Sequence, residues 1–90
     1  MLIERLTIAN TSGLYECFPD VAITRSGRLV VVYRESDSHS AAAFTHIVAR
    51  VSDDCGRSWS KPYCLARSEA RGGVLWKWNC PRISCLRDAR

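Results

Sequence analysis

The sequence lacks any apolar run long enough to cross a membrane: a spanning helix needs about 18 apolar residues, and the longest run is Leu29–Tyr33. The N-terminus shows no basic stretch leading into an apolar segment, so we expect no signal peptide and a cytoplasmic protein. The basic residues are scattered singly and are not clustered with aromatic residues. We therefore expect neither a membrane nor a nucleic acid as a partner.

Cysteine pairs with the spacing of metal ligands are also missing. The five cysteines stand at positions 17, 55, 64, 80 and 85, and no two form a C-x-x-C pair. The histidines, His39 and His46, are not placed to complete a zinc site. We expect free thiols in a reducing compartment, with no metal and no cofactor.

A helical period of 3.6 residues is absent, and the pattern is that of β-strands. The expected strands are 3–8, 20–25, 28–34, 44–51 and 59–65. The pair Ser26–Gly27 supplies a tight turn between the second and third of these. The continuous apolar run 29–33 predicts a strand buried on both faces. The expected fold class is all-β.

A weak internal repeat indicates the architecture. An offset of 62 places Pro19–Arg28 over Pro81–Arg90 without a gap, and Val21 then falls over Ile83. Units of four antiparallel strands that repeat at this spacing are typical of a β-propeller. We predict one four-stranded blade over about 19–66 and the first strand of the next blade at 80–90. The whole chain, 1–90, is then a fragment of one propeller domain.

The segment Ser52–Trp59 fits the pattern S-x-D-x-G-x-[ST]-W, known as an Asp-box, at every fixed position. Asp54 is suited to accept hydrogen bonds from turn amides, and Gly56 to supply a positive φ. Trp59 would cover the apolar side of the hairpin, while Ser52 and Ser58 would hold its ends. Each of these roles is structural.

On this box the chain resembles the sialidase (neuraminidase) superfamily of β-propellers with six blades, in which the box is the turn between the third and fourth strands of a blade. The segments 15–21, 32–39 and 78–83 are similar to the blade entries and strand ends of that family. The resemblance implies an exo-α-sialidase-like glycoside hydrolase that acts on terminal acidic sugars. Its partners would be a carbohydrate and the remaining blades.

Antiparallel geometry places Asp20, the end of the second blade strand and Arg82 at one rim, and the Asp-box at the other. The resemblance makes the first rim the active site. It implies Arg34 as a carboxylate-binding arginine and Asp37 as the general acid. The further candidates for substrate binding are Glu35, which would orient an arginine, His39, which would bind a sugar hydroxyl, Arg82 as a second carboxylate ligand, and Asp20.

Structural roles compete with these assignments. Arg34 and Glu35 would then pair with each other or with adjacent blades, Asp37 would cap the loop 36–39, and Arg82 would be a solvated edge residue.

One position departs from the family pattern. Sialidases open with Arg-Ile-Pro, and here the matching stretch is Cys17–Pro19, with Phe18 in place of the arginine. The family's nucleophile, a Tyr–Glu pair, would come from later blades, so the 90 residues alone are expected to be inactive. The alternative function is a catalytically silent propeller that binds carbohydrate or protein.

Overall fold

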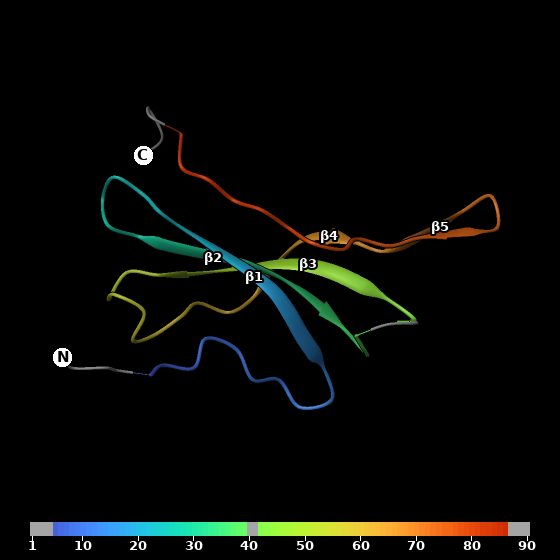
Figure 1. The fold of residues 1–90 in the computed structure, drawn as a ribbon, viewed down its shortest axis with the longest axis horizontal. Helices are drawn as coiled ribbons and strands as arrows, with labels where there is room; N and C mark the ends of the chain where they lie inside the picture. The colour runs from blue at the N-terminus through green and yellow to red at the C-terminus, as the bar shows by residue number, and fades with distance from the viewer. Residues whose placement is uncertain (1–4, 40–41, 87–90) are drawn as a thin grey trace.

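The fold is built from β-strands. A computed structural model describes residues 5–39 and 42–86, and this part of the chain contains strands and turns but no helix. The strands are β1 (Tyr15–Ile23), β2 (Leu29–Ser36), β3 (Thr45–Ser52), β4 (Tyr63–Arg67), β5 (Glu69–Arg71) and β6 (Val74–Trp76). The all-β class is therefore confirmed (Figure 1).

The first four strands form one antiparallel sheet in the order β1-β2-β3-β4, so each strand pairs with the next one along the chain. The predicted turn joins β1 to β2: Gly27 has a φ of 93° and its N–H donates to the Thr24 carbonyl at 2.9 Å. The strand expected over 59–65 begins only at Tyr63. Pro62 explains the late start, because proline has no N–H to donate to the ladder.

A second, two-stranded sheet lies within the segment 66–79, which the sequence analysis treated as a connection. Here β5 pairs with β6 in an antiparallel hairpin. Gly72 and Gly73 form its turn with φ values of 56° and 80°. Two-residue hairpin turns of this kind require a positive φ, which glycine adopts freely. The sequence signal for it was the Gly-Gly pair followed by the short apolar run Val74–Trp76.

Two expected strands are not formed. Residues 5–8, the described part of the strand predicted over 3–8, are not a strand, and residues 3 and 4 lie outside the described residues. Residues 80–86, predicted to begin the next blade, are not a strand either, and 87–90 lie outside the described part. Both segments cross a face of the sheet instead of running beside an edge strand, so their backbones meet no ladder partner.

The N-terminal segment covers one face of the sheet. Val31, Tyr33 and Val48 are its buried core, and Ala9 of the N-terminal segment, Trp59 and Cys64 pack against them. The Arg50 Nε donates to the Tyr33 hydroxyl at 2.9 Å, which gives the buried phenol a partner. This apolar cluster stabilises the central strands β2 and β3 against each other.

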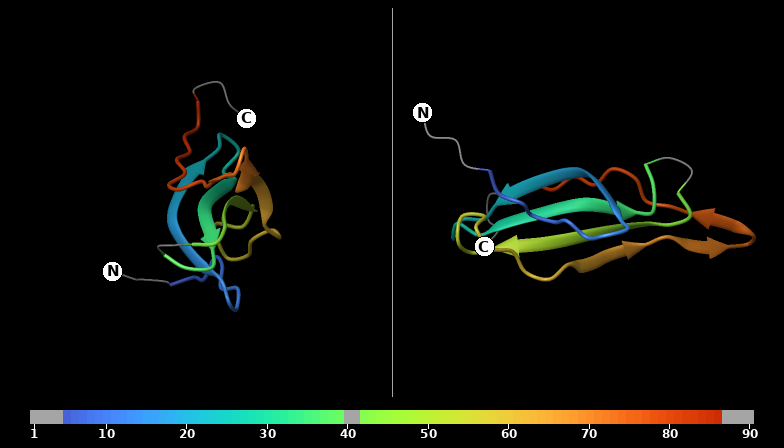
Figure 2. Two further views of the ribbon diagram at one scale, coloured as in Figure 1. Left: turned by 90° about the vertical axis from the view of Figure 1, so that its right-hand side faces the viewer. Right: turned by 90° about the horizontal axis from the view of Figure 1, so that it is seen from below.

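The segment 77–83 covers the opposite face. The Trp78 N–H donates to the Thr45 Oγ1 at 2.6 Å, and the Ile83 N–H donates to the Asp20 Oδ2 at 3.0 Å. Val32 beneath it is 4% exposed, and its neighbour Val31 on the other face is 2% exposed, which confirms that β2 is buried on both faces. Figure 2 shows the two covering segments on opposite sides of the sheet.

The outer strand β4 leaves apolar side chains in solvent. Tyr63 is 69% exposed and Leu65 is 54% exposed. In the described structure, β4 pairs only with β3, so its other edge carries unpaired backbone groups. The hairpin β5–β6 adds Trp76, which is 59% exposed. An open edge beside apolar side chains is a surface that another element can cover.

Candidate functional site

The sheet has two chemically different ends. Tyr15 at the start of β1 lies opposite Ser36 at the end of β2, and Ser36 lies opposite Thr45 at the start of β3. At the other end, Leu29 lies opposite Ser52, where the Asp-box begins. Residues 36–39 and the Asp-box are therefore at opposite ends of the sheet, as the antiparallel geometry predicted.

Arg34 is the central cation at the end of the sheet that carries residues 36–39. It is buried, with 6% exposure. Its Nη1 donates to the Asn79 Oδ1 at 3.1 Å, and its Nη2 donates to the carbonyls of His39 at 2.7 Å and Ser38 at 3.4 Å. Its Nε is buried without a hydrogen-bond partner in the described structure. Both terminal nitrogens are thus used to hold the loop after β2 and the segment 77–83 in place.

Phe18 covers the Arg34 guanidinium. The Arg34 Cζ lies 5.0 Å from the centre of the Phe18 ring, a cation–π distance. Phe18 has a φ of 54°, unusual for a bulky residue, and it sits where the β1–β2 register shifts between Cys17 and Asp20. This bulge turns the ring onto the cation and toward His39, whose ring centre is 5.7 Å away.

Asp37 lies in the loop after β2 and is exposed. Its two oxygens accept a hydrogen bond from the Ala43 N–H, at 2.9 Å from Oδ1 and 3.2 Å from Oδ2. Asp37 therefore caps the loop that leads into β3. Because the side chain is exposed, the lone pairs that Ala43 does not use face solvent.

Asp20 and Arg82 lie together on the face that segment 77–83 covers. The N–H groups of Ile83 and Val21 donate to the Asp20 carboxylate, both at 3.0 Å. These bonds, with the Arg82 charge as a smaller contribution, hold the pKa of Asp20 below its ordinary value. Arg82 is exposed, and its Nη1 donates to the Pro81 carbonyl at 3.3 Å and to the Cys80 Sγ at 3.4 Å.

The structure separates Glu35 from the other predicted residues. Neighbouring residues of a strand face opposite sides, so Glu35 lies on the other face from Arg34, opposite His46. His39 does join the Arg34 cluster, and its ring also contacts Tyr15, with 5.4 Å between the centres. Asn79, a partner of Arg34, was not among the predicted site residues. The two residues are 45 positions apart, and no local pattern links them.

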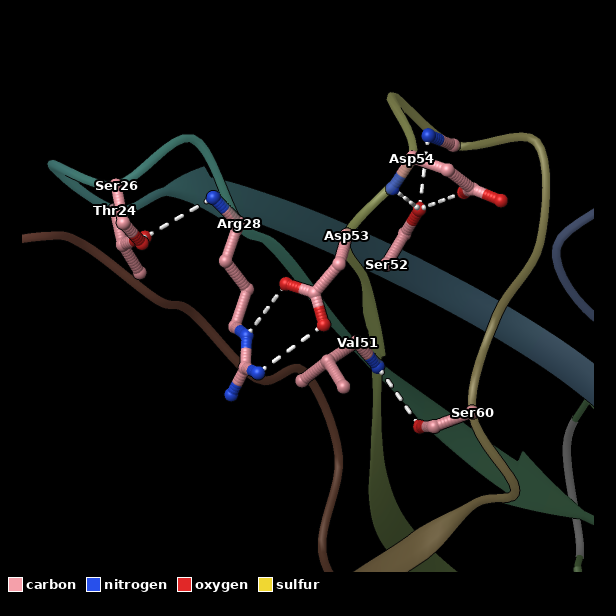
Figure 3. Close-up of polar contacts among 9 residues, drawn as sticks. Thr24, Ser26, Arg28, Val51, Ser52, Asp53, Asp54 and Ser60 are labelled. Atoms are coloured by element: carbon pink, nitrogen blue, oxygen red, sulfur yellow. Dashed lines mark hydrogen bonds and ion pairs between the residues drawn. The ribbon is translucent and has the colours of Figure 1, made fainter.

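The Asp-box forms a compact hydrogen-bonded turn between β3 and β4 (Figure 3). The Ser52 hydroxyl donates to the Asp54 Oδ1 at 2.8 Å and accepts from the Gly56 N–H at 2.9 Å. The Asp54 carboxylate also accepts from the N–H of Ser58, at 2.8 Å, and from its hydroxyl. Gly56 has a φ of 86°, and its carbonyl accepts from the Trp59 Nε1 at 3.0 Å. The predicted hydrogen-bonding roles thus agree with these contacts.

Beside the box, Asp53 and Arg28 form a two-pronged ion pair. The Arg28 Nε donates to the Asp53 Oδ1 at 2.8 Å, and its Nη2 donates to Oδ2 at 3.1 Å (Figure 3). The Arg28 side chain is 50% exposed and that of Asp53 is 64% exposed. The pair links the β1–β2 turn to the Asp-box at the surface, where solvent screens it.

We expect Asp54→Ala to lower the melting temperature of the chain by about 10 °C, because it removes the acceptor shared by Ser52 and both donors of Ser58. Asp53→Ala is the matched control. It removes only the exposed ion pair with Arg28 and should shift the melting temperature by no more than about 2 °C. Equal losses in the two variants would contradict a structural role for the box.

The same carboxylate predicts a dependence on pH. Hydrogen bonds from Ser58 and Ser52 lower the pKa of Asp54 from 3.8 to about 2. A group with a lowered folded-state pKa stabilises the fold above its unfolded pKa and loses that effect as pH falls through the folded value. The stability difference between wild type and Asp54→Asn, measured by thermal melts, should therefore be constant at neutral pH and shrink between about pH 4 and pH 2.

Neither a metal-binding cluster nor a membrane-spanning helix is found in the described part of the chain. The described His, Cys, Asp and Glu side chains form no group of three or more that could hold a metal ion. No helix in the described ranges is long and apolar enough to cross a membrane. Comparison of the chain with family models, curated proteins and solved structures finds no match.

Proposed function

We propose that this chain is one blade of a sialidase-like β-propeller, and that the full-length protein is an exo-glycosidase acting on terminal acidic sugars. The observation that carries the proposal is the Asp-box turn. Its five fixed residues make the hydrogen bonds and turn of a rigid scaffold at one end of the antiparallel sheet. At the opposite end lie the charged residues Arg34 and Asp37.

The open edge of the sheet supports the assignment to a larger propeller. A single blade buries its outer surfaces only against neighbouring units. Tyr63 and Leu65 on β4, and Val21 and Ile23 at the end of β1, are all more than half exposed, with 69%, 54%, 53% and 59% of their surface accessible. Apolar side chains at these positions suit contact with further blades.

The contacts of the candidate residues suggest a separate role for each of them in binding and cleaving the sugar. In our proposal Asp37, exposed on the loop after β2, donates a proton to the glycosidic oxygen as the bond to the sugar breaks. Arg82 is exposed, and its guanidinium donates hydrogen bonds only to its chain neighbours Cys80 and Pro81 in the described structure, so it would bind the sugar carboxylate. Arg34 would hold the loop that carries Asp37.

The test is hydrolysis by the full-length protein that contains this blade. We expect it to release 4-methylumbelliferone from an acidic-sugar glycoside. Arg82→Gln should lower kcat/KM for that substrate by about 10- to 100-fold and should leave a neutral-sugar glycoside unaffected. Arg5→Gln, which removes an exposed arginine of the N-terminal segment, is the control. Absence of hydrolysis on every glycoside would overturn the enzyme proposal.

A second candidate is a catalytically silent propeller that binds carbohydrate. Phe18 favours this alternative. It occupies the position at which sialidases have a carboxylate-binding arginine, and its ring covers Arg34. The cap that Asp37 forms on the Ala43 N–H favours it as well. Binding of glycans by the full-length protein without release of the aryl group would support this alternative.

A further inference from the structure

A small cavity on the other face of the sheet gathers reactive side chains that the proposed function does not use. It has a volume of about 190 Å³ and is lined by Glu35, His46, Cys64 and Arg67, with Val48 and Pro62 as its apolar walls. Its walls thus contain a carboxylate, an imidazole, a thiol and a guanidinium. Because Arg34 faces the opposite side of β2, this cavity is independent of the candidate sugar site.

Strand pairing explains why these four side chains meet. Glu35 on β2 lies opposite His46 on β3, which in turn lies opposite Arg67 on β4. Cys64 lies opposite Val48, two residues along β3 from His46 and on the same face. Residues directly opposite have Cβ atoms about 5 Å apart, and diagonal neighbours about 7–8 Å. A register shift between Ile47 and Val48 brings both Cys64 and Arg67 to this face.

The polar side chains that line the cavity do not pair with one another. In the described structure, the side chains of Glu35, His46 and Arg67 form no hydrogen bond or ion pair among themselves. The Cys64 thiol makes one weak bond, donating to the Ala66 carbonyl at 3.5 Å. The His46 ring packs beside Phe44, with 4.9 Å between ring centres. A half-buried thiol beside an imidazole and an unpaired guanidinium is an environment that favours nucleophilic cysteine.

We propose that this cavity is a reactive-thiol site for small anionic electrophiles. Cys64 is the nucleophile, His46 accepts its proton, and Arg67 binds the anionic group of the incoming molecule. Glu35, opposite His46, places a carboxylate on the same face as the imidazole that receives this proton. The apolar walls formed by Val48 and Pro62 limit the ligand to a few heavy atoms.

Iodoacetate is the probe, and its reaction follows directly from this arrangement. The thiol proton moves to the His46 imidazole, and the Cys64 sulfur attacks the methylene carbon. The S–C bond forms as the C–I bond breaks, and iodide leaves with the electron pair of that bond. The product is S-carboxymethyl-Cys64, and no oxidant or reductant takes part.

The sequence makes the measurement selective, because trypsin places each cysteine on a separate peptide. Cys64 falls in Ser58–Arg67 and Cys55 in Val51–Arg57, while Cys17, Cys80 and Cys85 fall in three other peptides. Mass spectrometry after brief exposure to limiting iodoacetate then gives the rate at each thiol. Cys55, Cys80 and Cys85 are exposed, so exposure alone predicts that they react faster than the half-buried Cys64.

We expect the opposite order, with Cys64 reacting about tenfold faster than Cys55. His46→Gln should lower the Cys64 rate about tenfold without changing the rate at Cys55. Arg67→Gln should abolish the preference of Cys64 for iodoacetate over the neutral iodoacetamide, while Arg5→Gln should leave that preference unchanged. In denaturant the rates at the five thiols should converge.

Two results would overturn the proposal. One is a Cys64 rate at or below that of Cys55 in the folded chain. The other is an unchanged ratio of iodoacetate to iodoacetamide reactivity in Arg67→Gln. The rate at Cys55 within each variant, together with its circular dichroism spectrum, shows whether that variant is folded. If Arg67→Gln unfolds, Arg67→Lys keeps the positive charge and should retain the preference for iodoacetate.

Discussion

In the full-length protein, Asp37→Asn is expected to lower kcat about 10²–10⁴-fold on glycosides with poor leaving groups. Such substrates need a proton on the departing oxygen. The same change should have far less effect on activated aryl glycosides, whose leaving group departs without a proton. The measurement is kcat on the two substrate types at one pH.

The structure makes asparagine the right substitution for this test. Its amide oxygen can still accept the hydrogen bond that the Ala43 N–H gives to Asp37, so the loop keeps its cap. Asp37→Ala, the companion variant, loses both the acid and the cap. A residue with only a structural role would lose stability in the alanine variant, and its activity would fall equally on both substrates. Equal losses in Asp37→Asn would remove this carboxylate from the mechanism.

Arg34→Met is expected to destabilise the chain by about 3 kcal/mol, measured by urea unfolding. The variant removes the buried guanidinium that donates to the carbonyls of Ser38 and His39 and to the Asn79 amide oxygen. Arg34→Lys should recover part of this loss, because an ammonium keeps the charge but not the planar fork that reaches several acceptors.

Arg82→Met is the matched control for Arg34→Met. Arg82 is an exposed arginine on the same segment as Asn79, and its replacement should change stability by no more than about 0.5 kcal/mol. If Arg34 were instead a free carboxylate-binding residue, Arg34→Met would leave the unfolding midpoint unchanged and would lower only the affinity for acidic sugars. Comparison of the two readouts separates the roles.

Local features of the sequence were sufficient to predict the four-stranded sheet. The alternation along each strand, the Ser26–Gly27 turn and the apolar run 29–33 depend on neighbours in the chain, and their outcomes agree with the structure. The turn residues of the Asp-box are equally local. Arg34 and Asp37 were singled out from the end of one strand, and the structure places them at that end of the sheet.

The features that the sequence did not predict depend on contacts between residues far apart in the chain. The positive φ of Phe18 and its position over Arg34 arise from a bulge that no local pattern marks. The path of residues 77–83 across the sheet depends on bonds to Thr45 and Asp20, which are 33 and 63 positions away. The cavity around Cys64 depends on a register shift between β3 and β4, and strand alternation alone does not reveal such a shift.

The segment 77–83, which covers one face of the sheet, also suggests an order of assembly. Each strand of the meander pairs with its neighbour along the chain, so its hairpins close short loops early in folding. The bond between Ile83 and Asp20 closes a loop of 63 positions, which has a larger entropic cost and forms late. Until that step, Val32 and Arg34 have no cover from residues 77–83. A translating ribosome adds residues 77–83 after all four strands, so this face of the newly made sheet stays uncovered until that segment has been synthesised.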